Sequence, residues 1–258
     1  MVDTKPLKQK LKDGRPVVGC WLSMSSAPVA EIIAHAGFDF VIIDHEHAPG
    51  TLTDAGDELR AMSATDVAAI IRVPWNDPVY IKRALDTGAH GVMVPMVETA
   101  DDARRAVAAC RYPPDGIRGA AYTQIRASRY GLLADDYLRT VNDNLVIICQ
   151  VESARTVDNI AEIAAVDGID VLFVGPSDLS GSVGKLGQFD DPEVRDLFAR
   201  TEAALRTSGI TMGTVPRTDA DWRALVDAGY TMMASASDVA LLRIGAAAHV
   251  GAFRDHTG

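Results

Sequence analysis

Short apolar runs rich in β-branched residues recur along the chain and alternate with segments of helical spacing. Each run is apolar almost throughout, which is typical of strands that are covered on both faces. The intervening segments place apolar side chains three and four positions apart, and several of them end at glycine, a common helix terminator. The apolar runs are residues 15–22, 39–47, 67–73, 91–95, 145–153, 171–178, 211–215 and 230–237.

Strands that alternate with helices pair in parallel through βαβ units. Eight such units in 258 residues predict a (β/α)₈ TIM barrel, and we expect residues 1–258 to form a single barrel domain. A doubly wound sheet is the main alternative. It needs a glycine-rich turn after the first strand, whereas residues 20–28 read CWLSMSSAP, so the barrel is favoured.

Two connections between the expected strands are long. The first lies between the fourth and fifth strands and carries Arg111, Arg118, Arg126 and Arg129, and the second is residues 181–192, after the sixth strand. Long connections in a compact domain are usually functional. We therefore expect both on the carboxyl-terminal rim, where barrel active sites are built.

Composition narrows the class of protein. With 25 basic and 35 acidic side chains the net charge is −10, which argues against nonspecific nucleic-acid binding, although a local arginine cluster still suits an anionic small molecule. The three cysteines have no Cys-x-x-Cys spacing, so neither a disulfide framework nor a thiolate zinc site is expected. No signal peptide or membrane-spanning run is recognisable, and we expect a cytoplasmic protein without a membrane partner.

Polar side chains interrupt the apolar runs where strands end. His45 and His47 follow the second expected strand, Arg72 lies in the third, Gln150 and Glu152 end the fifth, and Asp178 follows the sixth. The carboxyl ends of barrel strands converge on one face. Gln150 and Glu152 are two positions apart and share one side of a strand, so we expect both to face the mouth of the barrel.

The segment Asp44-His45-Glu46-His47 invites a zinc interpretation, because a His-x-His at a strand end binds zinc in amidohydrolase barrels. That design needs further histidines after later strands. The remaining histidines are His35, His90, His249 and His256, none in such a place, so zinc is disfavoured. Glu152 and Asp178 instead offer two hard oxygen ligands from neighbouring strands. With waters and a chelating substrate, that set suits Mg²⁺ or Mn²⁺.

Covalent mechanisms find little support. None of the lysines lies within an apolar strand, where burial would make it nucleophilic, and Lys185 in a loop is a faint candidate. Cys149 has apolar neighbours and is interpreted as a packing residue. The turn that contains Ser177 and Asp178 favours an anion site, because main-chain N–H groups at such a turn suit a carboxylate. An ordinary capped turn is the alternative.

Five ordered stretches resemble the class II, metal-dependent pyruvate aldolases, the family of 4-hydroxy-2-oxoheptanedioate aldolase and 2-dehydro-3-deoxyglucarate aldolase. They are residues 37–49, 70–103, 112–119, 150–153 and 171–180. The resemblance covers essentially the whole chain, with macrophomate synthase and the citrate lyase β-like enzymes as more distant relatives. It implies a barrel of the phosphoenolpyruvate/pyruvate type. It also implies a last helix that packs on a neighbouring subunit, often in homohexamers, and the apolar residues 239–253 fit this.

By position, the resemblance implies that Glu152 and Asp178 bind a divalent metal, Mg²⁺ or Mn²⁺ and possibly Co²⁺. It makes Gln150 a support for the substrate oxygen, Arg72 the cation at the enolate oxygen, and His47 with Asp44 the proton-transfer pair. Glu46 would brace this pair. The family's usual stretch is Asp-Gly-Glu-His, and His45 stands here in place of the glycine. We expect that change to enlarge the edge of the metal site.

These inferences predict a lyase that cleaves or forms 4-hydroxy-2-oxo acids from pyruvate, or hydroxypyruvate, and an aldehyde. The substrates would be a 2-oxo acid and an aldehyde. Oxaloacetate decarboxylation, or a lyase reaction on a coenzyme A thioester, is an alternative because it would pass through the same enolate. A non-catalytic barrel is a further alternative, but it would not need the complete set of Asp44, His47, Arg72, Glu152 and Asp178.

Overall fold

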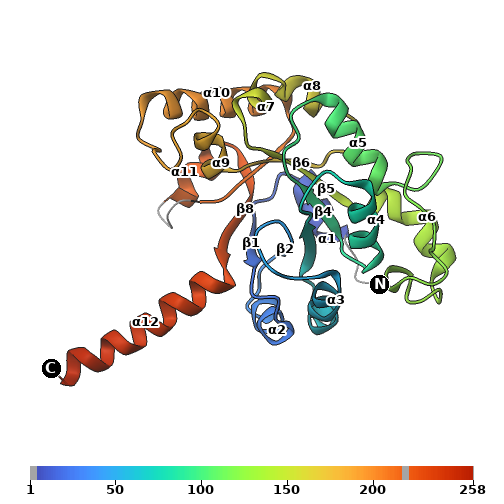
Figure 1. The fold of residues 1–258 in the computed structure, drawn as a ribbon, viewed down its shortest axis with the longest axis horizontal. Coiled ribbons are helices and arrows are strands. Elements are labelled where there is room, and N and C mark those ends of the chain that lie inside the picture. Colours follow the sequence, from blue (N-terminus) through green and yellow to red (C-terminus); the bar gives the residue numbers. More distant parts are fainter. Residues whose placement is uncertain (1–4, 217–220, 258) are drawn as a thin grey trace.

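The computed structural model describes residues 5–216 and 221–257, and its core is a closed barrel of eight parallel strands in sequence order (Figure 1). Every apolar run of the sequence contains one strand, so the predicted TIM barrel is confirmed. The strands are β1 (Val17–Leu22), β2 (Phe40–Asp44), β3 (Ala68–Arg72), β4 (Gly91–Val94), β5 (Val146–Val151), β6 (Val171–Val174), β7 (Thr211–Thr214) and β8 (Tyr230–Ser237).

Helices follow the strands and cover the outside of the barrel. Several begin with a side-chain cap, for example Thr51 and Asp54, which form a reciprocal capping box at the start of α3. The helical segment after β5 is divided in two at Asn159. The helices are α1 (Lys5–Lys12), α2 (Ala27–His35), α3 (Leu52–Ala61), α4 (Pro78–Asp86), α5 (Ala100–Cys110), α6 (Ala134–Asn144), α7 (Ala154–Asp158), α8 (Ile160–Ala164), α9 (Pro176–Gly181), α10 (Pro192–Ser208), α11 (Asp221–Asp227) and α12 (Asp238–Thr257), with 3₁₀ turns η1 (Met62–Ala64) and η2 (Arg126–Ser128).

The strand side chains divide into two apolar cores. One set, including Phe40, Ile70 and Phe173, fills the inside of the barrel, and the alternate set packs against the helices. Gly19 is required by the inner core, because a Cβ there would meet the Phe40 ring at 2.2 Å. Burial on both faces explains why the strands are apolar throughout instead of alternating.

The last helix, α12, extends away from the barrel (Figure 1). Its exposed apolar side chains are Val239, Leu241, Leu242, Ile244, Val250 and Phe253. Packing of this helix on a neighbouring subunit stays a prediction. The molar mass of the protein in solution, measured by light scattering, tests whether it forms an oligomer. Within the described residues, none of the helices combines the length and the apolar character that a bilayer crossing requires.

Candidate active site

An ion-pair network joins the ends of β2 and β3 at the mouth of the barrel. Arg72 donates from Nε to Oδ1 of Asp44 at 2.9 Å and from Nη2 to Oδ2 at 2.7 Å, a bidentate geometry that fixes the guanidinium plane. Its Nη1 lies 3.0 Å from Oε2 of Glu46, and its Cζ lies 4.4 Å from the centre of the Trp21 ring. Arg72 is thus a fixed cation at the mouth.

The network and burial together shift the pKa values of its carboxyl groups. Burial opposes ionisation of Asp44, yet the hydrogen bonds and charge of Arg72 hold its pKa below the usual range. Burial raises the pKa of Glu46, and Arg72 offsets only part of that rise. Arg72 therefore favours the ionised form of Asp44, whereas burial disfavours the ionised form of Glu46.

Gln150 lies in β5 and Glu152 directly follows that strand, and their side chains meet on one side, as the sequence predicts. Gln150 donates from Nε2 to Oε1 of Glu152 at 2.6 Å, and the main-chain N–H of Met96 donates to Oε2 at 3.0 Å. Gly175 leaves room for this carboxyl group, because a Cβ there would lie 3.1 Å from Cγ of Glu152. Burial, followed by the nearby charges of Glu46 and Asp178, raises the pKa of Glu152 to about 7.

Asp178 and Ser177 lie in the first turn of α9, directly after β6, and both are exposed. The electrostatic effect of Asp178 on Glu152 and Glu46 places its carboxylate in the same acidic group. The first N–H groups of a helix have no partner within the helix. The structure thus brings together the residues expected to hold a metal and an anion, while their roles stay predictions.

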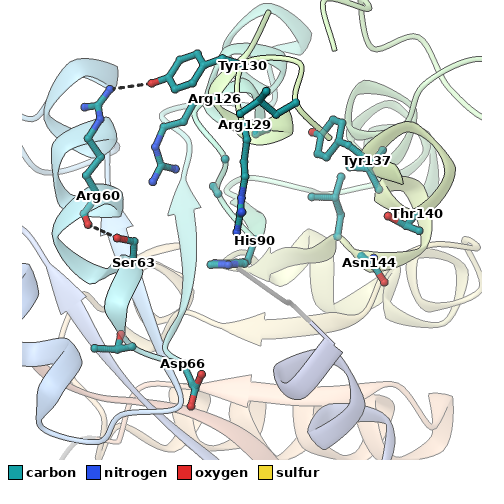
Figure 2. A pocket seen from close by; sticks show the side chains of 17 residues that line it. Arg60, Ser63, Asp66, His90, Arg126, Arg129, Tyr130, Tyr137, Thr140 and Asn144 are labelled. Atoms are coloured by element: carbon teal, nitrogen blue, oxygen red, sulfur yellow. Dashed lines mark hydrogen bonds between the residues drawn. The ribbon is translucent and has the colours of Figure 1, made fainter. Parts of the chain in front are cut away.

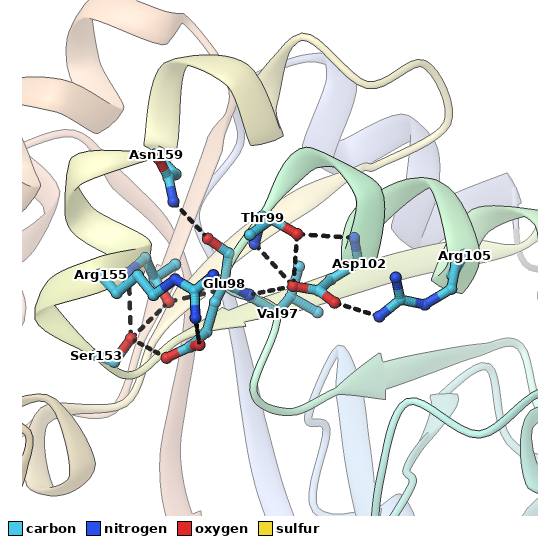
Figure 3. Close-up of polar contacts among 9 residues, drawn as sticks. Val97, Glu98, Thr99, Asp102, Arg105, Ser153, Arg155 and Asn159 are labelled. Atoms are coloured by element: carbon cyan, nitrogen blue, oxygen red, sulfur yellow. Dashed lines mark hydrogen bonds and ion pairs between the residues drawn. The ribbon is translucent and has the colours of Figure 1, made fainter.

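The sequence predicts no role for Met96, whose main-chain N–H donates to Glu152. Met96 has a φ of 53°, in the left-handed region, which non-glycine residues rarely adopt away from functional sites. Ser153 and Arg155 bind the Glu98 carboxylate at 2.8 and 3.1 Å, and Asn159 donates to the Glu98 carbonyl at 2.8 Å. This network ties the loop after β4 to the loop after β5, as Figure 3 shows, so it positions Met96 against Glu152.

His47 lies at the mouth with 65% of its side chain exposed, and its Nε2 is 3.9 Å from Oε2 of Glu46. Asp44 contacts His47 through the main chain, because the N–H of His47 donates to Oδ1 of Asp44 at 3.3 Å. Asp44 therefore shapes the loop that carries His47, and the carboxylate beside the imidazole is that of Glu46. A proton-transfer role for His47 stays a prediction.

His45 is buried, and its ring contacts α4, where Nδ1 lies 3.0 Å from the Tyr80 hydroxyl and the two rings meet edge to face. Enlargement of the metal site's edge by His45 stays a prediction. Burial lowers the pKa of His45, although Asp44 and Asp54 partly offset this effect. A buried, neutral imidazole between helices has a packing role that a glycine would not fill.

The expected position of the first long connection is wrong. Residues 111–133 follow α5, which returns the chain to the amino-terminal end of the barrel, and Arg126 there donates to the carbonyl of Thr87 just before β4. Arg118 is buried, binding Asp86 and the Tyr137 hydroxyl at 2.7 and 2.9 Å. The second connection does lie at the carboxyl-terminal end, and its Lys185 is paired with Asp191 and Glu193.

The chain is similar to known proteins along most of its length. A family model described as HpcH/HpaI aldolase/citrate lyase matches residues 17–244. A 4-hydroxy-2-oxo-heptane-1,7-dioate aldolase from Salmonella dublin is 40% identical over 97% of this chain and 96% of its own. A solved HpcH/HpaI family protein from Burkholderia cenocepacia J2315 is 42% identical, with a TM-score of 0.92 over 97% of this chain and 99% of that chain.

A solved citrate synthase is 27% identical, with a TM-score of 0.86 over 100% of this chain and 99% of that chain. The fold is therefore shared by enzymes named for different reactions of carbon–carbon bonds. Because the family model spans most of the chain, and the barrel carries its polar residues at the expected strand ends, the chain belongs to the HpcH/HpaI aldolase/citrate lyase family of carbon–carbon lyases.

Proposed function

We propose that this protein is a divalent-metal-dependent aldolase that cleaves 4-hydroxy-2-oxo acids into pyruvate and an aldehyde, and catalyses the reverse addition. The observation that carries the proposal is the acidic group Glu46, Glu152 and Asp178 beside the fixed cation Arg72. The name of the Salmonella dublin relative supports a 4-hydroxy-2-oxo diacid as the substrate class.

The residues present fit a divalent cation. Burial, followed by the charges of Glu46 and Asp178, raises the pKa of the Glu152 carboxyl to about 7, and a cation bound beside it would favour its ionised form. Oε1 of Gln150 is buried and has no hydrogen-bond partner in the described chain. No group of three or more His, Cys, Asp or Glu side chains forms a complete metal site among the described residues. Mg²⁺ is commonly held by one or two carboxylates together with water and substrate oxygens.

Glu152 and Asp178 would hold the ion, with Mg²⁺ or Mn²⁺ as the first candidates. A bound divalent cation supplies Lewis-acid polarisation of the 2-oxo group. The protein itself binds and orients the 2-oxo acid. Ser177 and the first turn of α9 offer N–H groups to its carboxylate, and the cation Arg72 faces the oxygen where negative charge develops.

Cleavage needs a base for the 4-hydroxyl proton. When that proton leaves, the C3–C4 bond breaks, its electron pair forms the pyruvate enolate, and C4 becomes the aldehyde carbon. Protonation of C3 then yields the methyl group of pyruvate. We assign the base to His47, which is at the mouth and next to Glu46. An imidazole nitrogen can accept a proton and return it, which suits this role.

Removal of metal tests the proposal. Protein treated with EDTA and then freed of EDTA is assayed for pyruvate release from 4-hydroxy-2-oxoheptanedioate, alone and after addition of Mg²⁺, Mn²⁺ or Co²⁺. We expect turnover to vanish and to return with at least one ion, while circular dichroism stays constant. Full turnover in the metal-free protein would contradict the proposal.

Decarboxylation of oxaloacetate is a second candidate, because it forms the same enolate, and the same assay with oxaloacetate measures it. A lyase reaction on a coenzyme A thioester would need a basic surface for the nucleotide near the mouth. Arg126 and Arg129 instead line a cavity with His90 at the amino-terminal end of the barrel.

A further inference from the structure

A cavity of about 620 Å³ lies at the amino-terminal end of the barrel, away from the candidate active site. Its walls come from four places: the end of α3 with the turn after it, the turn before β4, the segment around η2, and α6. Figure 2 shows its lining side chains. The volume falls within the range of small-molecule sites, which is roughly 300–1,000 Å³.

The cavity is lined by three arginines, Arg60, Arg126 and Arg129, and by one acidic side chain, Asp66. This balance is opposite to that of the whole chain, whose net charge is −10. Arg60 is paired with Asp57 and donates to the Tyr130 hydroxyl at 3.4 Å. Arg126 and Arg129 have no carboxylate partner among the described residues.

The position of Arg126 is fixed by the main chain. Its Nη1 donates to the carbonyl of Thr87 at 2.8 Å. Gly88, with a φ of 93°, allows this approach, because a Cβ there would lie 2.8 Å from Nη1. Burial, followed by the like charge of Arg60, lowers the pKa of Arg126, so the positive charges in the cavity act on one another.

Arg129 and Tyr130 are held in an unusual backbone conformation. Both are in the left-handed region, with φ values of 53° and 55°, which costs roughly 1–2 kcal/mol for a residue with a Cβ. The buried Ser128 holds this turn, because its hydroxyl donates to the Ile125 carbonyl at 3.0 Å and accepts from the Gly131 N–H at 3.1 Å. Strained residues cluster where structure positions a functional group.

Arg118, from the same connection, shows what a structural arginine looks like here. Its side chain is fully buried, binds Asp86 and Tyr137, and stacks 4.6 Å from the centre of the Tyr112 ring. Arg129 has none of these features: it is exposed, and no side-chain hydrogen bond or ion pair holds it in the described chain. Burial and ion pairing account for the position of Arg118, whereas no contact in the described chain accounts for the orientation of the Arg129 side chain.

We propose that this cavity is a binding site for a small oxyanion, a phosphate or carboxylate compound, with Arg126 and Arg129 as its cations. Guanidinium groups bind both classes through paired N–H donors. The Tyr130 hydroxyl, which lines the same cavity, supplies a further hydrogen-bonding group for the rest of such a ligand. The site is separate from the candidate active site at the other end of the barrel.

Isothermal titration calorimetry of the metal-free protein tests the site, with pyrophosphate as the phosphate probe and citrate as the carboxylate probe. We expect at least one probe to bind, and the tighter one identifies the class of ligand. Arg129→Gln should weaken binding roughly tenfold or more, since it removes charge-assisted hydrogen bonds. Arg129→Glu should abolish binding.

Arg139→Gln is the matched control, because Arg139 also lies beside the cavity's wall on α6 but is exposed and does not line the cavity. It should bind the probes as the unaltered protein does. All three variants should keep their circular dichroism and their aldolase turnover, since these arginines lie outside the candidate active site. Absence of heat with both probes at about 10 mM would overturn the site. Equal affinity of the Arg129→Gln and Arg139→Gln variants would place the anion elsewhere and overturn it too.

Discussion

The two ends of the barrel carry opposite excesses of charge. At the carboxyl-terminal mouth, Asp44, Glu46, Glu152 and Asp178 gather around the cation Arg72. At the amino-terminal end, Arg126 and Arg129 line a cavity in which, among the described residues, Asp66 is the one acidic lining side chain. A surplus of one sign in a confined place is unfavourable without a counter-charge. The contrast points to a cation as the missing partner at the mouth and an anion as the missing partner at the other end.

The ends also differ in how they are positioned. The mouth residues follow strands directly, so the barrel itself sets their spacing. The cavity arginines come from a long connection, and a few contacts hold it, such as those of Ser128 and the hydrogen bond from Arg126 to the Thr87 carbonyl. We therefore expect substitutions at the mouth to affect both stability and turnover, whereas substitutions in the cavity affect binding alone.

The largest expected effect is on turnover, and it should differ between two buried carboxyl groups, Glu152 and Glu58. Burial raises the pKa of each to about 7, but Glu58 accepts from the main chain of Ser26 instead of facing the mouth. Glu152→Gln should lower kcat/KM for pyruvate release by about 10³-fold, about 4 kcal/mol. Glu58→Gln is the control and should stay within about threefold. Similar losses in both variants would mean that burial, not position at the mouth, explains the effect.

The second effect concerns stability. Arg72→Ala leaves the buried Asp44 carboxylate without its bidentate partner, and breaking such a pair costs about 3–5 kcal/mol of unfolding free energy. Arg129→Gln removes an equal charge from the other end and should cost less than about 0.5 kcal/mol. Urea unfolding measures both. Adding Asp44→Asn to Arg72→Ala should recover part of the loss, and no recovery would count against the ion pair as its cause.

The smallest effect is a pH dependence at Glu58. Because burial raises its folded pKa from 4.5 to about 7, the protonated form is favoured in the folded state. Its contribution to stability is complete below about pH 4.5 and is lost as the pH rises toward 7. Relative to Glu58→Gln, the unaltered protein should lose up to about 3 kcal/mol between pH 4.5 and pH 8. Parallel curves of unfolding free energy against pH for the two proteins would refute this assignment.

Much of the barrel is readable from the sequence, because strands buried on both faces leave a continuous apolar run. The pairing of Gln150 with Glu152 was predictable for a similar reason, since side chains two apart in a strand share a side. The role of Met96 was not predictable. It depends on a main-chain N–H held by a network of Glu98, Ser153 and Arg155, and no side-chain pattern reports where an N–H points.

His45 and Asp44 show the same limit within one short segment. The sequence places Asp44, His45, Glu46 and His47 side by side, which allows any pair of them to act together. In the fold, His45 contacts Tyr80 between the helices and Asp44 binds Arg72. His47 lies at the mouth beside Glu46. Adjacent residues in a bend after a strand point in directions that only the surrounding helices decide.

The sequence by itself determined the strand order, the parallel barrel and the strand ends that carry polar groups, because hydrophobic periodicity and short connections record these locally. Only the tertiary structure decided which carboxyl groups lie close enough to interact, which arginine is buried in an ion pair, and at which end of the barrel each long connection lies. Arg118 and Arg129 belong to the same connection, and the sequence does not distinguish their environments. One is buried against Asp86 and the other lines a cavity, because burial and pairing depend on residues distant in the chain.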